Sequence, residues 1–134
     1  MIGNGVDIGA NCFIARGSMS NTIIGSGPKL DALVHIAHNV SIGSNCELTA
    51  GTIIDGSSSI GNYSWLGVNS TLKDNTTIGD HVIVRAGEMV ISNVPDDDIV
   101  AEVPAKSIKH KVKTDTKFLR AGQRNEESSN SKLE

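Results

Sequence analysis

Two histidines, His35 and His38, are the side chains of this sequence best suited to acid–base chemistry. They lie three residues apart in the stretch Leu33-Val34-His35-Ile36-Ala37-His38-Asn39-Val40-Ser41-Ile42-Gly43. Imidazole has an ordinary pKa of about 6.5, so it can take a proton from an amine or a hydroxyl near neutral pH. The spacing alone leaves two interpretations open, a catalytic base or a pair of polar surface residues.

The two cysteines, Cys12 and Cys46, indicate no thiol chemistry. They are too few for a disulfide scaffold or for a zinc site made of four thiolates. Both fall on a position of the sequence repeat, described next, that we expect to face inward. We therefore predict that both are buried and reduced.

An aliphatic residue recurs at every sixth position and predicts the elements that must hold these side chains. The main series is Ile24, Leu30, Ile36, Ile42, Leu48, Ile54, Ile60, Leu66, Leu72, Ile78, Val84 and Val90. Ile2, Ile8 and Ile14 share the spacing, but four residues are inserted after them, near Gly17–Ser20. Four places after most aliphatic positions stands a small or β-branched residue. This period fits a short strand plus a tight turn, and neither an amphipathic helix nor a simple meander.

The composition indicates a thin, repetitive core and excludes several classes of protein. Aromatic residues make up 3% of the 134 residues, so Ile, Leu, Val and small side chains must fill the interior. Residues 1–105 carry a net charge of −7 and residues 106–134 a net charge of +4. An acidic body argues against nucleic-acid binding. No apolar run approaches the roughly 20 residues of a membrane span, and the start lacks signal-peptide features, so we expect a cytoplasmic protein that binds no membrane.

The six-residue repeat resembles that of the hexapeptide-repeat acyltransferases. In that family three hexads make one triangular coil of a left-handed parallel β-helix. The resemblance implies an all-β fold of about five coils over residues 1–92, with a capping C-terminal extension over residues 93–125. The polar composition of residues 126–134 predicts a disordered tail.

The stretch around the two histidines resembles the catalytic coil of the lipid A acyltransferases, where the second histidine is the general base. This resemblance implies that His38 is the base, that His35 supports it on the substrate side, and that Asn39 orients the ring. It also implies that the backbone N–H of Gly56, eighteen residues after His38, binds the oxyanion. A plain turn glycine is the alternative for Gly56. The sequence departs from these enzymes at Lys73–Thr76, where they carry a further histidine.

The C-terminal half resembles hexapeptide acetyltransferases that use acetyl-CoA, through Ser64-Trp65-Leu66-Gly67, Val84–Val90 and Val103-Pro104-Ala105-Lys106. The resemblance implies a homotrimer that needs no metal and holds acetyl-CoA between subunits. The backbone around Ala86 and Gly87 would contact the pantetheine arm, and Lys106 a phosphate of CoA. Trp65 either stacks near the cofactor or covers the coil face. For the lysines after Lys106, a solvated basic tail is the alternative.

These features predict an acyltransferase, most simply an acetyltransferase. The acetyl group would pass from acetyl-CoA to an amine or hydroxyl of a sugar or nucleotide sugar, by direct attack with His38 as general base. The alternative from another class is a non-catalytic β-helix that serves as a scaffold or assembly module. A γ-type carbonic anhydrase is disfavoured, because the histidine spacing does not match the three zinc ligands of those enzymes.

Overall fold

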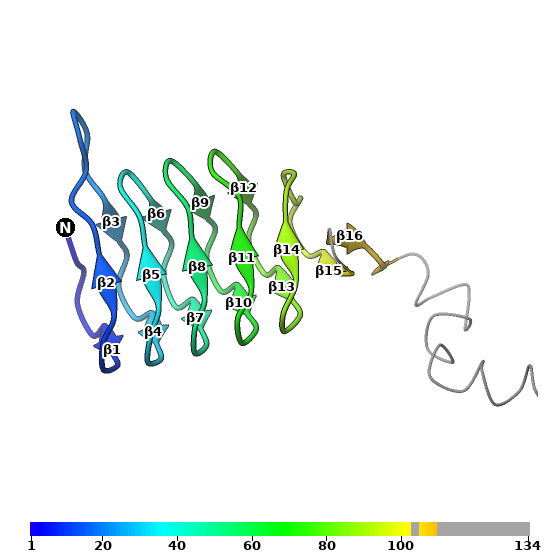
Figure 1. Ribbon diagram of the computed structural model, residues 1–134, viewed down its shortest axis with the longest axis horizontal. Coiled ribbons are helices and arrows are strands. Elements are labelled where there is room, and N and C mark those ends of the chain that lie inside the picture. The colour runs from blue at the N-terminus through cyan, green and yellow to red at the C-terminus, as the bar shows by residue number, and fades with distance from the viewer. Residues whose placement is uncertain (103–104, 110–134) are drawn as a thin grey trace, which may run out of the picture.

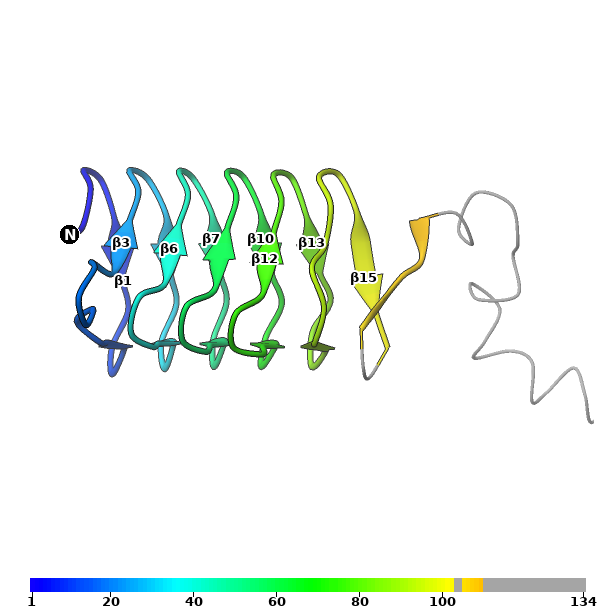
Figure 2. The ribbon, with the colours of Figure 1, turned by 90° about the horizontal axis from the view of Figure 1, so that it is seen from above.

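The computed structural model describes residues 1–102 and 105–109, where all the named regular elements are β-strands. The chain winds through three sheets in turn, so that each of the first four coils contributes one strand to each sheet. Figures 1 and 2 show the coils stacked side by side along one axis. This is the β-helix of about five coils that the six-residue repeat predicts, and the expected all-β fold is confirmed.

The three sheets form the faces of the coil stack. The seven-stranded face contains β1 (Asp7–Ile8), β4 (Lys29–Leu30), β7 (Glu47–Leu48), β10 (Trp65–Leu66), β13 (Ile83–Val84), β15 (Ile99–Ala101) and β16 (Lys106–Ser107). The five-stranded face contains β2 (Phe13–Ile14), β5 (His35–Ile36), β8 (Ile53–Ile54), β11 (Thr71–Leu72) and β14 (Met89–Val90). The four-stranded face contains β3 (Ile23–Ile24), β6 (Ser41–Ile42), β9 (Ser59–Ile60) and β12 (Thr77–Ile78).

The core is a column of aliphatic side chains along the axis. Every member of the six-residue series from Ile24 to Val90 is buried. The small position of the repeat also faces inward, and several of its hydroxyl groups bond to the backbone of the next coil. Ser58 Oγ donates to the Lys73 carbonyl oxygen at 3.0 Å, and Ser64 Oγ to that of Gly79 at 2.9 Å. Those bonds satisfy polar atoms that would otherwise be costly to bury.

Replacing a core leucine should destabilise the whole stack. Leu48 is fully buried in a middle coil, so Leu48→Ala is expected to lower the free energy of unfolding by about 2–5 kcal/mol. Urea denaturation followed by circular dichroism measures this change. Glu47→Ala is the matched control, because Glu47 is the exposed neighbour on the same strand, and its effect should stay within about 0.5 kcal/mol. Equal losses of unfolding free energy for both variants would contradict the arrangement in which Leu48 faces the core and Glu47 faces solvent.

Both cysteines are free thiols, and Cys46 is buried while Cys12 is partly buried. Cys46 Sγ donates to the Gly61 carbonyl oxygen at 2.9 Å, and Cys12 Sγ to that of Asp31 at 3.0 Å. Burial raises the pKa of the Cys46 thiol above its ordinary value, which keeps the unreactive protonated form at neutral pH. The prediction of a buried free thiol therefore holds for Cys46, whereas Cys12, in the first coil, is only partly buried.

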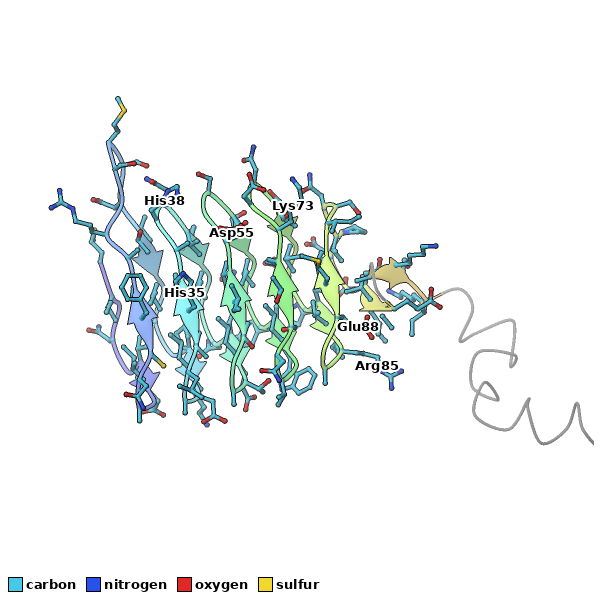
Figure 3. All side chains as sticks on the ribbon, in the orientation of Figure 1. His35, His38, Asp55, Lys73, Arg85 and Glu88 are labelled. Atoms are coloured by element: carbon cyan, nitrogen blue, oxygen red, sulfur yellow. The ribbon has the colours of Figure 1, made fainter. Side chains whose placement is uncertain are left out.

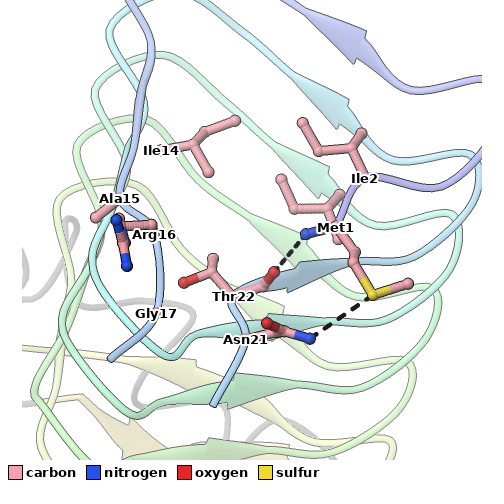
Figure 4. A pocket seen from close by; sticks show the side chains of 9 residues that line it. Met1, Ile2, Ile14, Ala15, Arg16, Gly17, Asn21 and Thr22 are labelled. Carbon is pink, nitrogen blue, oxygen red and sulfur yellow. Dashed lines mark hydrogen bonds between the residues drawn. The ribbon is translucent and has the colours of Figure 1, made fainter. Parts of the chain in front are cut away.

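The first coil leaves inward positions open to solvent. Ile2 is 53% exposed and Ile8 is 44% exposed, although both belong to the aliphatic series that is buried elsewhere. A hollow at this end is lined in part by Met1, Ile2, Ile14 and Arg16 (Figure 4). Beside this hollow, the amino group of Met1 donates to the Thr22 carbonyl oxygen at 2.8 Å.

The winding continues beyond residue 92. Ile78 forms a parallel bridge with Val94, and β15 pairs in parallel with β13. β16 then folds back antiparallel on β15, which ends the parallel stack within the described residues. Most of the extension predicted at 93–125, and all of the tail predicted at 126–134, lies outside the residues that the structure describes. Residues 1–102 and 105–109 contain no helix long and apolar enough to cross a membrane.

Candidate active site

His38 lies at the corner where the chain turns from the five-stranded face to the four-stranded face, here called the His38 corner (residues 15–22, 37–40, 55–58 and 73–76). Successive coils stack there in register, as the bond from the Ser57 N–H to the His38 carbonyl oxygen at 3.0 Å shows. Six residues line an open pocket: His38, Asp55, Gly56, Ser57, Asp74 and Asn75. Figure 3 shows His38, Asp55 and Lys73 following one another along this corner.

The imidazole of His38 lies directly against Gly56. A Cβ atom at residue 56 would fall 2.6 Å from Nε2 of His38 and 2.7 Å from its Cε1. Any other residue would therefore force the ring to move. Gly56 is buried while His38 is exposed, so the ring covers the glycine and faces the pocket. The sequence indicated Gly56 only as an N–H donor or a turn glycine, and the space that it provides for the ring is visible only in the structure.

The N–H of Gly56 already has an acceptor. It donates to Asp55 Oδ1 at 2.8 Å. The N–H can therefore bind a developing oxyanion only after the Asp55 carboxylate has rotated away. Asp55 is exposed, so its side chain can turn into solvent.

Asn39 contacts the other edge of the His38 ring. The Nδ1 atom of His38 and the Oδ1 atom of Asn39 are 3.0 Å apart. The backbone of Asn39 has a φ of 59°, a left-handed conformation that asparagine adopts more readily than most residues. The structure thus brings the predicted base, His38, into contact with its predicted orienting residue and with Gly56.

His35 does not join this group. Its side chain points outward from β5, and its ring stacks on that of Phe13 with centroids 5.0 Å apart and an interplanar angle of 18°. Figure 3 shows His35 on the five-stranded face and His38 at the corner. His35 is therefore not among the residues that line the His38 pocket.

The residues predicted to bind the cofactor lie elsewhere on the chain. Ala86 and Gly87 form the turn between the seven-stranded and five-stranded faces, here called the Gly87 corner. Trp65 points outward from β10 and is partly buried, and Lys106 is exposed on β16. Within one chain, the structure does not bring these four residues to the His38 corner.

Two carboxylates in the pocket were not assigned by sequence analysis. Asp55 precedes Gly56, and Asp74 lies two coils after His38, where it pairs with Lys73 at 3.2 Å. Counting in steps of eighteen from His38 reaches Gly56 and then Asp74, so the repeat already placed Asp74 near His38.

In the part of the chain that the structure describes, no three His, Cys, Asp or Glu side chains are grouped to hold a metal ion.

The repeat is shared with a family of known proteins. The model of the family described as bacterial transferase hexapeptide (six repeats) matches residues 21–56 and 57–87. The chain belongs to this family. UDP-3-O-acylglucosamine N-acyltransferase of Caulobacter sp. (strain K31) is 39% identical to this hexapeptide-repeat chain over 106 residues, which are 79% of the chain and 31% of the relative. The chain thus spans less than a third of the length of that relative.

Solved structures of hexapeptide acyltransferases share the coil stack. PerB from Caulobacter crescentus, in complex with CoA and GDP-perosamine, is 27% identical with a TM-score of 0.69, over 79% of this chain and 52% of PerB. LpxA from Acinetobacter baumannii is 26% identical with a TM-score of 0.78, over 79% of this chain and 42% of LpxA. The relatives named here are acyltransferases, and PerB has been solved with CoA and GDP-perosamine bound.

Proposed function

We propose that this chain carries an acyltransferase site in which His38 is the general base. The placement of His38 is the observation that supports this most directly. Asn39 holds one edge of the imidazole, and the other edge lies against Gly56 at an open pocket. Transfer of an acyl group to an amine or hydroxyl requires removal of one proton, and a neutral imidazole is suited to that step.

The reaction proceeds by direct attack on the thioester. Nε2 of His38 accepts the proton of the acceptor group while the acceptor nitrogen or oxygen bonds to the carbonyl carbon. The resulting oxyanion is bound by the Gly56 N–H once Asp55 has turned away. Collapse of this intermediate breaks the C–S bond, and the imidazolium returns its proton to the departing thiolate. Neither cysteine lines the pocket, and direct attack by the acceptor forms no acyl-enzyme.

For the donor we propose acetyl-CoA, and for the acceptor an amine or hydroxyl of a sugar or nucleotide sugar. The C-terminal half of the sequence resembles acetyl-CoA enzymes in segments that include Trp65 and Lys106. The likeness to PerB, which binds CoA and GDP-perosamine, supports both choices. The acceptor would enter the pocket at Asp55 and Asp74, whose carboxylates can accept hydrogen bonds from sugar hydroxyl or amino groups.

We further propose that the site is completed by a second copy in a homotrimer. The His38 corner and the Gly87 corner border opposite edges of the five-stranded face. If this face points toward a threefold axis, the Gly87 corner of one chain meets the His38 corner of the next. Three apolar side chains exposed on the face offer a contact surface: Phe13 at 55%, Ile53 at 43% and Met89 at 42%.

Light scattering and calorimetry test this arrangement together. At micromolar concentration we expect a molar mass three times the chain mass of 14.1 kDa. Titration with acetyl-CoA or free CoA should show one site per chain, with the same stoichiometry for His38→Ala because His38 is assigned to proton transfer. A monomer would contradict the shared site. A trimer that binds no CoA at millimolar concentration would instead favour a non-catalytic scaffold.

A further inference from the structure

We propose that the four-residue insertion at Gly17–Ser20 sets the tautomer of His38, acting through Asn39. The inference rests on the proposed role of His38 as the base. The insertion interrupts the six-residue period at the His38 corner, one coil before His38 itself. In this proposal Asn39 is a positioning residue, and the inserted residues have a chemical role at the His38 corner.

The amide of Asn39 is held by the inserted loop on several sides. Its Nδ2 donates to the carbonyl oxygens of Ser18 and Ser20, both at 3.1 Å, and to Ser20 Oγ at 2.6 Å. Its Oδ1 accepts a bond from the Ser18 N–H at 3.2 Å. The backbone N–H of Asn39 donates to Thr22 Oγ1 at 2.9 Å. In the described part of the chain, the side-chain hydrogen bonds of Ser18 and Ser20 all go to Asn39.

These partners permit only one orientation of the amide. A carbonyl oxygen can only accept a hydrogen bond and a backbone N–H can only donate one. The flipped amide of Asn39 would set its oxygen against the carbonyl oxygens of Ser18 and Ser20, and its NH₂ group against the Ser18 N–H. The loop therefore directs Oδ1 toward the ring of His38.

An oxygen at Nδ1 decides where the imidazole proton sits. Oδ1 of Asn39 can only accept, so Nδ1 of His38 must donate at the observed 3.0 Å. A neutral imidazole has a single N–H, which leaves Nε2 with its lone pair free. Nε2 is the nitrogen that lies against Gly56 beside the pocket. The contact thus prepares the atom that must accept the proton.

The shape of the loop requires a glycine at residue 17. A Cβ atom at residue 17 would overlap the carbonyl oxygen of Ser20, one of the two carbonyls that hold Asn39. At the tip, Met19 is fully exposed and has a φ of 67°. The insertion therefore folds back tightly, with backbone acceptors directed at Asn39 and its largest side chain directed at solvent.

Two variants of the full chain test the inserted loop and the Asn39 amide separately. Deleting residues 17–20 makes Ile14 and Ile24 six residues apart, which restores the regular period, so this variant should fold. Asn39→Gly keeps the left-handed backbone but removes the amide. Asn45→Gly is the matched control, because Asn45 has a similar φ of 56° at another corner. Nuclear magnetic resonance of the imidazole nitrogens, with the His38 signals assigned from His38→Ala, reports the tautomer without any substrate.

The unmodified chain should show a protonated Nδ1 and an unprotonated Nε2, and so should Asn45→Gly. The deletion and Asn39→Gly should show exchange between both tautomers and a kcat lower by about 10–100-fold, less than the loss expected from removing the base itself.

A protonated Nε2 in the unmodified chain, or an unchanged tautomer after deletion of the loop, would overturn the inference. The positioning role of the loop and the proposed acyltransferase function can be tested independently of each other. An Nδ1–H tautomer that depends on the loop, found in a chain without acyl transfer, would support the positioning role and overturn the proposed function.

Discussion

His38→Ala is expected to lower kcat for acyl transfer by about 10²–10⁴-fold, the usual contribution of a general base. The fold should persist, because His38 is exposed and, among the residues that the structure describes, its side chain forms a hydrogen bond with Asn39 alone. Release of CoA thiol measures the rate, and thermal unfolding checks the fold. His81→Ala is the matched control, since His81 is also an exposed corner histidine, stacked on Tyr63 at 5.3 Å.

Unchanged turnover in His38→Ala would contradict the assignment of the base. In that case His35→Ala becomes decisive, because His35 is the neighbouring histidine on the same coil. Loss of activity in His35→Ala alone would move the base to the five-stranded face, where the ring stacks on Phe13. Equal losses in His38→Ala and His81→Ala would indicate a general effect of removing surface imidazoles.

Gly56→Ala is expected to lower kcat by about 10²-fold, since displacing a catalytic group by about 1 Å can cost that much. The added methyl group would stand 2.6 Å from Nε2 of His38, so the ring must swing outward. The backbone N–H at residue 56 remains, and therefore the variant tests the space for the ring rather than the donor. Steady-state kinetics with separate kcat and KM values is the measurement.

A double-mutant cycle supplies the control for this prediction. In the His38→Ala background the ring is absent, and Gly56→Ala should then cost no further activity. A full additional loss in that background would show that the added methyl group disturbs something other than the His38 ring. Full activity of the single variant would mean that the ring does not need to lie against Gly56.

The sequence by itself determined the fold and the register of the site. An aliphatic residue at every sixth position from Ile24 to Val90 can be buried only if each short strand turns the chain by the same amount. The hexapeptide-repeat proteins that the sequence resembles have three such strands per coil, and coils of eighteen residues bring His38 next to Gly56 and then Asp74. These neighbours were predictable because residues one coil length apart stack on one another wherever the period is regular.

Only the tertiary structure decided how the side chains are used. It separated His35 from His38, because one points outward from a strand and the other lies in a turn. It placed Asp55 on the N–H of Gly56 and the inserted loop on Asn39. Side-chain rotation decides the first of these contacts. The second depends on the path of an insertion, which breaks the period and therefore cannot be counted from it.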